Sequence, residues 1–364
     1  MPFKLPEYRT PPFSDAPLRD SPDVRSAPVE TDGVAPLGYH AFSIFPEYFK
    51  VDGTWLLPKE SRMDCAAVVR RPPEGPEIDV VEFRRLRRGE RVVLGRTEDG
   101  SEGIWVDARA FLADSKEPDA FAFRAGRSRE TAYSRDYDEL YDLLRHEREH
   151  GSVVWVLGPA VAFDHDSRAS MQALIERGYV HAVLAGNALA THDLEAGLLR
   201  TALGQDIYTQ ENRPNGHYNH LDLINLARGH GSLEKLIEKE NIGDGIVRAA
   251  LKKGIPLVLA GSIRDDGPLP SVIAGAYEAQ DAMRTVLRGA TTVIALATQL
   301  HAIASGNMTP SYSVRGGRLR PVYLYSVDVS EFAVNKLLDR GSLSATPIVA
   351  NVQDFLVHLK KSLS

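Results

Sequence analysis

Residues 153–160 read VVWVLGPA, and this short apolar run, closed by Gly158 and Pro159, sets the pattern of the C-terminal half of the chain. Similar runs recur downstream, separated by stretches whose apolar residues have helical spacing. Apolar runs that alternate with helices predict a parallel sheet covered on both faces, an α/β architecture. We expect six strands, at residues 153–157, 182–185, 257–260, 293–297, 322–327 and 348–350.

Glycine, small polar residues or acids follow nearly every one of these strands. In an open parallel sheet, ligands bind in the crevice at the carboxyl ends of the strands, so these exits outline a cleft of nucleotide size. Loops in any such fold are polar, and plain loops are therefore an equal alternative on this pattern alone. The exits are Gly158-Pro159-Ala160, Gly186-Asn187-Ala188, Gly261 through Asp266, Thr298 through His301, Asp328, and Asn351-Val352.

The N-terminal part has a different character. Residues 1–38 hold eight of the 22 prolines and few aliphatic residues, so we expect an extended arm, packed on a partner subunit. Residues 39–130 contain short runs of β-branched and aromatic residues between Gly, Pro and Asp, which predict a small β-rich domain. A helix over residues 133–150, ending at Gly151, bridges to the α/β domain of residues 131–364.

The composition of the chain excludes several classes of function. The 364 residues suggest about two domains, and the net charge of −6 is spread through the chain, so a nucleic-acid partner is not expected. No run of about 18 apolar residues predicts a membrane span. The single cysteine, Cys65, excludes an intramolecular disulfide and a multi-thiolate metal site, which favours a reducing cytoplasm. A cytoplasmic enzyme or a binding protein remains.

Several familiar motifs are missing or weak. The chain has no GxGxxG, no GxxxxGK[ST] and no GxSxG sequence. Residues 146–150, HEREH, match the HExxH pattern of zinc proteases, but the charged neighbours favour a solvated helix end, and we expect no metal site.

Two segments carry candidate chemistry. In residues 260–270, AGSIRDDGPLP, Arg264 can clamp a carboxylate, while Asp265 and Asp266 can accept hydrogen bonds from an ammonium group or a ribose. The alternative is a structural turn in which Arg264 pairs with an aspartate. In residues 216–221, GHYNHL, two histidines can shuttle protons, or Asn219 can cap a helix with surface histidines beside it.

These segments resemble one family. The motifs VLGPA (156–160), AGNALATHDLE (185–195), GHYNHL, VLAGSIRDDGPLP (258–270), ATQLHAIASGNMTPS (297–311) and VNKLLDRGS (334–342) are similar to the archaeal-type ornithine cyclodeaminases, which include the C-terminal part of cyanobacterial arginine-to-proline enzymes. The segments DGTWLLPKESRMDCAAV (52–68), RGERVVLG (88–95) and GIWV (103–106) resemble the LOR/SDH-type domain that precedes the catalytic domain there. The resemblance covers about residues 40 to 360.

The resemblance implies a deoxyhypusine-synthase-like, Rossmann-type domain that binds NAD tightly in a homo-oligomer, a dimer or tetramer. It implies the conversion of L-ornithine to L-proline and ammonia. Hydride leaves Cα for the nicotinamide, the δ-amine attacks the resulting imine, ammonia departs, and hydride returns to the cyclic imine. The cofactor is thus recycled.

Matching positions carry the family's site residues over to this chain. For the substrate side, the resemblance assigns Arg264 to the carboxylate, Asp265 to an amine, and His217, Asn219 or His220 to proton transfer, with Lys336 and Asp339 as weaker candidates. The residues assigned to NAD are Asn187, Ala188, Asp266, Thr298, Gln299, Leu300, His301, Asp328, Asn351 and Val352.

The chain also departs from the family pattern. Asn351 replaces an acid, Gln299 a Met, Ser326 a Cys, and residues 161–166, VAFDHD, an HTG-like turn. These changes put substrate identity in doubt, so two alternatives stay open. One is a cyclodeaminase or lyase that acts on another diamino acid, such as lysine, in a specialised pathway; the other is a catalytically silent NAD-binding sensor of amino acids. Cys65 is expected to lie away from every strand exit.

Overall fold

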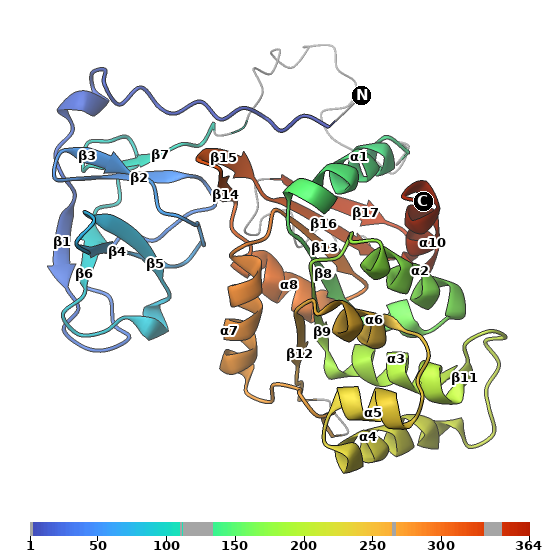
Figure 1. Cartoon of the computed structure of the whole chain (residues 1–364). Coiled ribbons are helices and arrows are strands. Elements are labelled where there is room, and N and C mark those ends of the chain that lie inside the picture. Colours follow the sequence, from blue (N-terminus) through green and yellow to red (C-terminus); the bar gives the residue numbers. More distant parts are fainter. Residues whose placement is uncertain (1–2, 110, 112–133, 264–266, 331–343) are drawn as a thin grey trace.

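A computed structural model describes residues 3–109, 111, 134–263, 267–330 and 344–364 of the chain. Figure 1 shows a β-rich N-terminal part beside a larger α/β C-terminal part. No helix within these described ranges is long and apolar enough to cross a membrane.

Two antiparallel sheets build the β-rich part. One has the order β1-β6-β4-β5 and the other β3-β2-β7. Side chains alternate across β4, so that Ala67 packs with Phe49 and Ile104 between the sheets, whereas Val68 packs on the opposite face. The strands are β1 (Arg25–Pro28), β2 (Glu47–Val51), β3 (Thr54–Leu56), β4 (Ala66–Arg70), β5 (Glu77–Val81), β6 (Arg91–Leu94) and β7 (Ile104–Val106), with short 3-10 helices η1 (Leu18–Asp20) and η2 (Phe83–Arg85).

Much of the N-terminal segment packs on its own chain. Strand β1 pairs with β6, and Val29 after it is buried. Closer to the N-terminus, the Tyr8 hydroxyl donates to Asp107 Oδ2 at 2.9 Å, and the Phe3 ring lies 5.9 Å from that of Tyr323. Residues 25–29 therefore belong to the β-rich part, although their composition placed them in an extended arm.

The six expected strands form one parallel sheet, which confirms the α/β prediction. Its order is β12-β9-β8-β13-β16-β17, which is 3-2-1-4-5-6 in chain order, the doubly wound Rossmann arrangement. Two strands have the predicted bounds, and β17 begins four residues before its predicted start. The strands are β8 (Val153–Leu157), β9 (Ala182–Gly186), β12 (Leu257–Ala260), β13 (Thr292–Leu296), β16 (Tyr323–Asp328) and β17 (Ser344–Val349).

Helices cover both faces of this sheet. On one face, Trp155 of β8 lies in a cluster with side chains of α1, α2, α3 and α10; on the other, Val154 lies with side chains of α7 and α8. The helices are α1 (Ser134–His150), α2 (His165–Glu176), α3 (Asn187–Leu199), α4 (Asn219–His230), α5 (Leu233–Lys239), α6 (Ile246–Lys253), α7 (Ala276–Leu287), α8 (Gln299–Met308) and α10 (Val352–Ser362). Shorter elements are η3 (Pro159–Ala162), η4 (Gly216–Tyr218), β10 (Thr201–Ala202) and β11 (Gln205–Asp206).

A hairpin joins the two parts. Strands β14 (Tyr312–Arg315) and β15 (Arg318–Pro321) leave the α/β part and reach the β-rich part (Figure 1). The Tyr312 hydroxyl donates to the Pro58 carbonyl at 2.8 Å, and the Ser311 amide donates to Ser61 Oγ at 2.8 Å. Tyr312 is fully buried, so the contact is part of the folded core.

The HEREH segment differs from its predicted environment. Glu147 is fully buried on α1, where it pairs with the buried Arg320 and accepts a hydrogen bond from Thr291. The expectation of a solvated helix end is wrong for this residue. The pairing ties α1 to β15 and to the start of β13, and it gives Glu147 a structural partner of opposite charge.

Candidate cofactor and substrate site

The topological switch point of the sheet lies between β8 and β13. These neighbouring strands lead away to opposite sides, β8 towards β9 and β13 towards β16. Ligands of doubly wound sheets bind outside the carboxyl ends of the strands at this point. The elements that follow are η3 after β8 and α8 after β13, so their first residues form the floor of the candidate site.

The two turns at the switch point approach each other closely. The Gly158 amide donates to the Leu296 carbonyl at 2.8 Å. A Cβ on Gly158 would overlap the Ala297 carbonyl, so only glycine fits this approach. Ala297 itself has φ +47°, a left-handed conformation that a non-glycine residue adopts at a cost and that clusters at functional sites.

His301 and the start of α3 meet at the same edge. A Cβ on Gly186 would lie 2.8 Å from His301 Cε1, so the imidazole of α8 is held against the turn that begins α3. This contact brings together two groups of residues assigned to NAD, Asn187 with Ala188 and the 298–301 segment.

No described side chain caps α3 or α8. Gly186 and Thr298 occupy their N-cap positions without a side-chain hydrogen bond to the first turn. Helix N-termini carry unpaired N–H groups and partial positive charge, which together bind anions such as phosphate. Helix α10 differs, because Asn351 Oδ1 accepts from the amides of Gln353 and Asp354 at 2.8 and 3.3 Å.

Asn187 holds the loop that follows β12. Its Oδ1 accepts from the Leu269 amide at 3.0 Å, its Nδ2 lies 3.5 Å from the Gly267 carbonyl, and its side chain is buried. Both ends of the amide are therefore directed at the C-terminal flank of the SIRDDGPLP segment. Arg264, Asp265, Asp266, Lys336 and Asp339 lie outside the described residues, and their roles stay predictions.

The GHYNHL segment spans η4 and the start of α4. His217 is exposed and its ring lies 4.2 Å from that of Tyr218. Asn219 is not a helix cap, because Tyr218 occupies that position and the Asn219 amide donates to Thr201 Oγ1 at 2.7 Å. His220 is partly buried and its ring lies 6.1 Å from that of His192.

The structure adds a buried pair that the sequence reasoning missed. His192 Nδ1 lies 2.9 Å from Glu195 Oε2 on α3, and both residues are buried. Glu195 also accepts from Thr201 Oγ1 at 2.8 Å, which links it to Asn219. The ring of Phe163, from the loop after β8, lies 5.6 Å from the His192 ring. The i, i+3 spacing of a His and a Glu within THDLE was the available signal.

Cys65 borders α8, contrary to its expected isolation from the strand exits. A cavity of about 510 Å³ lies between the two parts of the chain, and both Cys65 and Leu300 line it. Burial raises the pKa of the Cys65 thiol to about 11, so the group is protonated at neutral pH. A thiol in this state is a poor nucleophile and fits a packing role.

Comparison with known proteins identifies the family. Residues 139–359 match the family described as arginine dihydrolase ArgZ-like, C-terminal, Rossmann fold. The chain belongs to this family. Over 350 residues it is 38% identical to an ornithine cyclodeaminase of Methanopyrus kandleri, which covers 94% of this chain and 78% of the relative.

Solved structures of the family support the same grouping. A LOR/SDH protein from Methanococcus maripaludis superimposes with a TM-score of 0.84 and 33% identity, covering 94% of this chain and 98% of that one. AgrE, solved in a ternary complex with ornithine and NAD⁺, superimposes with a TM-score of 0.57 and 32% identity, covering 96% of this chain and 47% of AgrE. The protein named AgrE among curated relatives is a bifunctional arginine dihydrolase/ornithine cyclodeaminase of Nostoc.

The departures from the family pattern have structural explanations at two positions. An aspartate in place of Asn351 could accept the same two amide hydrogen bonds, so the change preserves the cap of α10. In the 161–166 segment, Asp164 Oδ1 caps α2 by accepting from the amides of Asp166 and Ser167 at 2.9 and 3.0 Å. Val161 is buried in the core, so much of this rewritten segment serves the fold.

The remaining assigned positions are placed along the same edge. Asp328 ends β16 and its Oδ1 accepts from the Ser330 amide at 2.9 Å. Gln299 and Leu300 are exposed on the first turn of α8, whereas Val352 is buried at the start of α10. Ser326, which is a departure from the family pattern and not an assigned site residue, is buried within β16.

Proposed function

We propose that the chain is an NAD-dependent ornithine cyclodeaminase that converts L-ornithine to L-proline and ammonia. The observation that carries the proposal is the meeting of two uncapped helix N-termini, of α3 and α8, at the switch point of the sheet. The AgrE complex with ornithine and NAD⁺, from the same family, supports this choice of substrate and cofactor.

The donor set at this edge fits a dinucleotide. The amides of Asn187 and Ala188 on α3 and of Gln299 and Leu300 on α8 would hold its phosphates, because the first turns lack side-chain caps. Thr298, His301, Asp328, Asn351, Val352 and Asp266 complete the proposed cofactor residues. NAD supplies hydride transfer from and back to the substrate carbon.

The loop anchored by Asn187 would bind the substrate. Arg264 can hold the ornithine carboxylate through two parallel hydrogen bonds, and Asp265 can accept from an ammonium group. Asn187 bonds to Leu269 and approaches Gly267, which keeps this loop beside the start of α3. Lys336 remains a weaker proposed participant.

Proton transfer is proposed for the histidines next to this edge. The carboxylate of Glu195 orients His192 through Nδ1, which leaves Nε2 as the ring atom available to move a proton. His220 lies beside His192, and Asn219 supports the same network through Thr201. His217, also proposed for proton transfer, is exposed to solvent.

A product assay tests this function. Purified full-length chain is incubated with catalytic NAD and, separately, ornithine, lysine or 2,4-diaminobutyrate, and ammonia and cyclic imino acids are measured. Formation of proline and ammonia from ornithine is expected. Pipecolate from lysine would replace the proposal by the alternative diamino acid, and absence of turnover across the panel would favour the silent sensor.

A binding measurement tests whether the chain binds NAD, independently of whether it turns over a substrate. Nucleotide released on denaturation, or a rise in Tm on adding NAD, is the expected result. A nucleotide-free protein whose Tm does not respond to NAD would contradict the cofactor site itself.

A further inference from the structure

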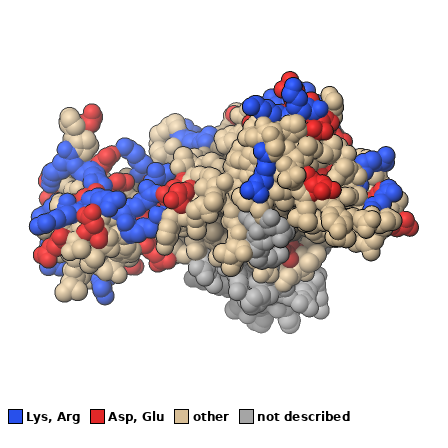
Figure 2. All heavy atoms as spheres, turned by 90° about the horizontal axis from the view of Figure 1, so that it is seen from below, with Lys and Arg blue, Asp and Glu red and all other residues tan. Residues whose placement is uncertain are grey.

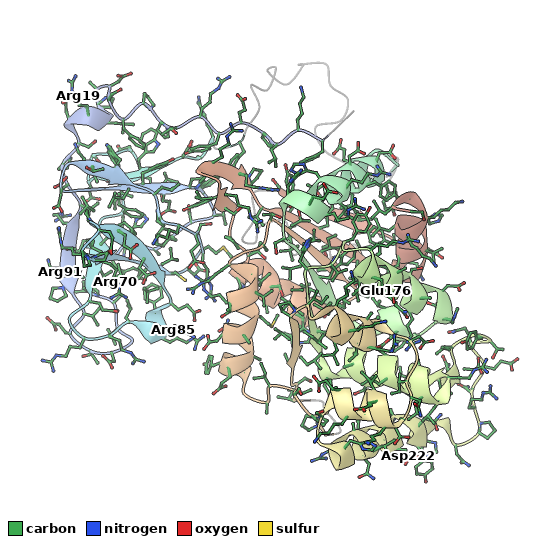
Figure 3. All side chains as sticks on the ribbon, viewed as in Figure 1. Arg19, Arg70, Arg85, Arg91, Glu176 and Asp222 are labelled. Carbon is green, nitrogen blue, oxygen red and sulfur yellow. The ribbon has the colours of Figure 1, made fainter. Side chains whose placement is uncertain are left out.

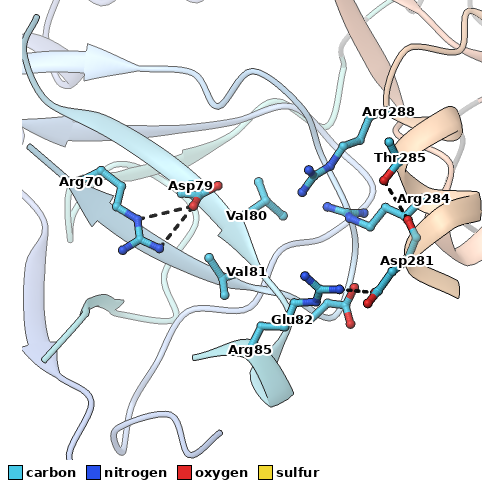
Figure 4. A pocket seen from close by; sticks show the side chains of 10 residues that line it. All are labelled: Arg70, Asp79, Val80, Val81, Glu82, Arg85, Asp281, Arg284, Thr285 and Arg288. Atoms are coloured by element: carbon cyan, nitrogen blue, oxygen red, sulfur yellow. Dashed lines mark hydrogen bonds and ion pairs between the residues drawn. The ribbon is translucent and has the colours of Figure 1, made fainter. Parts of the chain in front are cut away.

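A second cavity lies at the junction of the two parts, away from the switch point. Its volume is about 290 Å³, at the small end of the range for ligand pockets. Figure 4 shows strand β5 on one side and helix α7 on the other, with Arg284 and Arg288 directed from α7 towards β5. The lining residues are Arg70, Asp79, Val80, Val81, Glu82, Arg85, Asp281, Arg284, Thr285 and Arg288. None of them is assigned to NAD or ornithine.

Arg284 is the unusual member of this lining. Its side chain is about 6% exposed, and its Nη2 donates to Glu60 Oε1 at 3.2 Å. Its Nη1 is buried and has no hydrogen-bond partner among the described residues. Burial lowers the pKa of the Arg284 guanidinium in spite of the opposing effect of Glu60. A buried cation with an unsatisfied donor is costly, so the position favours an added anion.

The neighbouring arginines already have partners. Arg70 Nη2 lies 2.7 Å from Glu90, and Arg85 pairs with Asp281. Arg288 Nε lies 3.1 Å from Glu60, so one oxygen of Glu60 serves both Arg288 and Arg284. Glu60 carries one negative charge against these two cations, and its other oxygen, Oε2, is buried without a hydrogen-bond partner among the described residues. The excess positive charge is concentrated at the α7 side of the cavity.

We propose that this cavity binds a small carboxylate, which accepts a hydrogen bond from Arg284 Nη1. The ligand would bridge α7 and β5 and so join the two parts of the chain. This site is separate from the proposed active site and does not depend on the proposed reaction.

The charge balance selects this ligand class. Four arginines and three acids line the cavity, and their ion-pair partners outside the lining, the cations Arg62 and Arg84 and the acids Glu60 and Glu90, cancel one another. One positive charge is left for a monoanion to neutralise. A phosphate dianion would exceed that charge and would share the cavity with the carboxylates of Asp79, Glu82 and Asp281, which repel it. Thr285 can add a hydroxyl group, whose own donor is directed to the Asp281 carbonyl at 2.9 Å, as an acceptor for a ligand hydroxyl or ammonium group.

Thermal unfolding of the full chain tests the proposal. The Tm is measured in sodium acetate, sodium phosphate and sodium chloride at equal pH and ionic strength. Acetate should raise the Tm in a saturable manner, by about 2 °C or more above chloride. Equal Tm values in acetate and chloride, or a rise with phosphate alone, would overturn the carboxylate assignment.

Variants of the lining residues test whether the acetate-dependent rise in Tm arises at this cavity. Because Arg284→Met alone would leave the partly buried Glu60 with Arg288 as its remaining ion-pair partner among the described residues, the double variant Glu60→Gln/Arg284→Met is measured beside it. Both should lose the acetate response. Arg91→Met is the matched control, since Arg91 is an exposed arginine on β6, on the side of the β-rich part opposite α7 (Figure 3), and it should keep the response.

Equilibrium dialysis with labelled acetate provides a readout that does not depend on stability. Wild-type protein should bind about one acetate at this site with an affinity that the folded double variant lacks. Retention of the saturable binding by the folded double variant would overturn the proposal.

Discussion

At the scale of single residues, His192 connects the sequence motif THDLE to the proposed chemistry. Glu195 fixes one ring nitrogen of His192, and the other nitrogen is left for proton transfer. The pair is buried on α3, where His192 lies about one and a half helical turns from the uncapped N-terminus. This burial distinguishes His192 from the exposed His217, and its role in proton transfer stays a proposal.

The variant His192→Asn tests this role. An asparagine amide can replace Nδ1 as the donor to Glu195, but it removes Nε2. We expect kcat with ornithine to fall by about 100-fold or more, the range of a lost general acid or base, while the Tm and NAD binding stay close to wild type. His230→Asn on α4, which removes a partly exposed histidine bonded to Glu240, is the control. A fall in Tm equal to that of a core variant would instead indicate a structural role.

His181 predicts a pH dependence of stability. Burial lowers the pKa of His181, and the Val153 amide donates to its unprotonated Nδ1 at 2.9 Å. The unfolded chain therefore binds this proton first as the pH falls below about 6.5, so the free energy of unfolding should decrease from there until the folded ring also titrates. Urea unfolding from pH 7.5 to 5 measures the decrease. His181→Asn, which keeps an acceptor and removes the titration, should show a smaller slope.

Asparagine assignments show why site residues are harder to predict than strands. The sequence left Asn219 open between a helix cap and a proton-transfer residue, and the structure rules out the cap, because its amide donates to Thr201. Asn351 caps α10, a bond that the sequence did not predict, and its assignment to the cofactor stays a prediction. Asn187 was correctly placed at a strand exit, but its amide is directed at the loop after β12. An amide side chain bonds to whatever backbone or hydroxyl group the tertiary structure brings near, and that neighbour is distant in sequence.

At the scale of elements, α3 is the clearest case of a helix defined by its surroundings. Most of its residues are buried, including the polar Asn187, Thr191 and Asp193. The strands were predictable because apolar runs between turn residues are local signals. The polar residues of a buried helix need partners from other elements, and those contacts could not be read from local spacing.

Asp193 connects α3 to the neighbouring helices α6 and α2, and its contacts lead to a prediction about stability. Its carboxylate accepts from the amides of Ile246 and Val247 at 2.9 and 2.8 Å, which caps α6, and it pairs with the buried Arg168. Asp193→Ala should lower the free energy of unfolding by about 3–5 kcal/mol, because it leaves a buried cation under-compensated. Asp244, whose side chain is 52% exposed, also pairs with Arg168, and Asp244→Ala should cost about 1 kcal/mol or less. Urea denaturation compares them; equal losses would contradict a capping role.

At the scale of the whole molecule, charge is distributed unevenly between the parts. Figure 2 shows basic and acidic side chains close together over the β-rich part, and a broad uncharged area on the α/β part. Ion pairs such as Arg70 with Glu90 and Arg25 with Glu102 explain the mixed signs. The small net charge was visible in the composition, but its pairing required the fold. The homo-oligomer, a dimer or tetramer, stays a prediction that light scattering can test.

The change from β-rich to α/β structure was predictable because composition changes along the chain. The contribution of residues 25–29 to the β-rich part was not, since β1 gains its stability from pairing with β6, about 65 residues away. The hairpin β14–β15 was also missed. Its residues Ser311 and Tyr312 contact residues 58–61, about 250 positions earlier in the sequence.

Because the hairpin of the α/β part packs on the β-rich part, we expect two separately expressed fragments of the chain to bind each other. A fragment of residues 134–364 would expose Tyr312 and Ser311, which the intact chain buries against residues 58–61. Coexpression with residues 1–109 should restore a one-to-one complex that survives gel filtration, whereas Tyr312→Ala in the larger fragment should abolish recapture of the smaller one. If the fragments remain apart, the covalent connection alone holds the parts together. If they reassemble, the hairpin contact is sufficient to hold the two fragments together without a peptide bond between them. Each fragment can then be labelled or mutated separately before the two are combined.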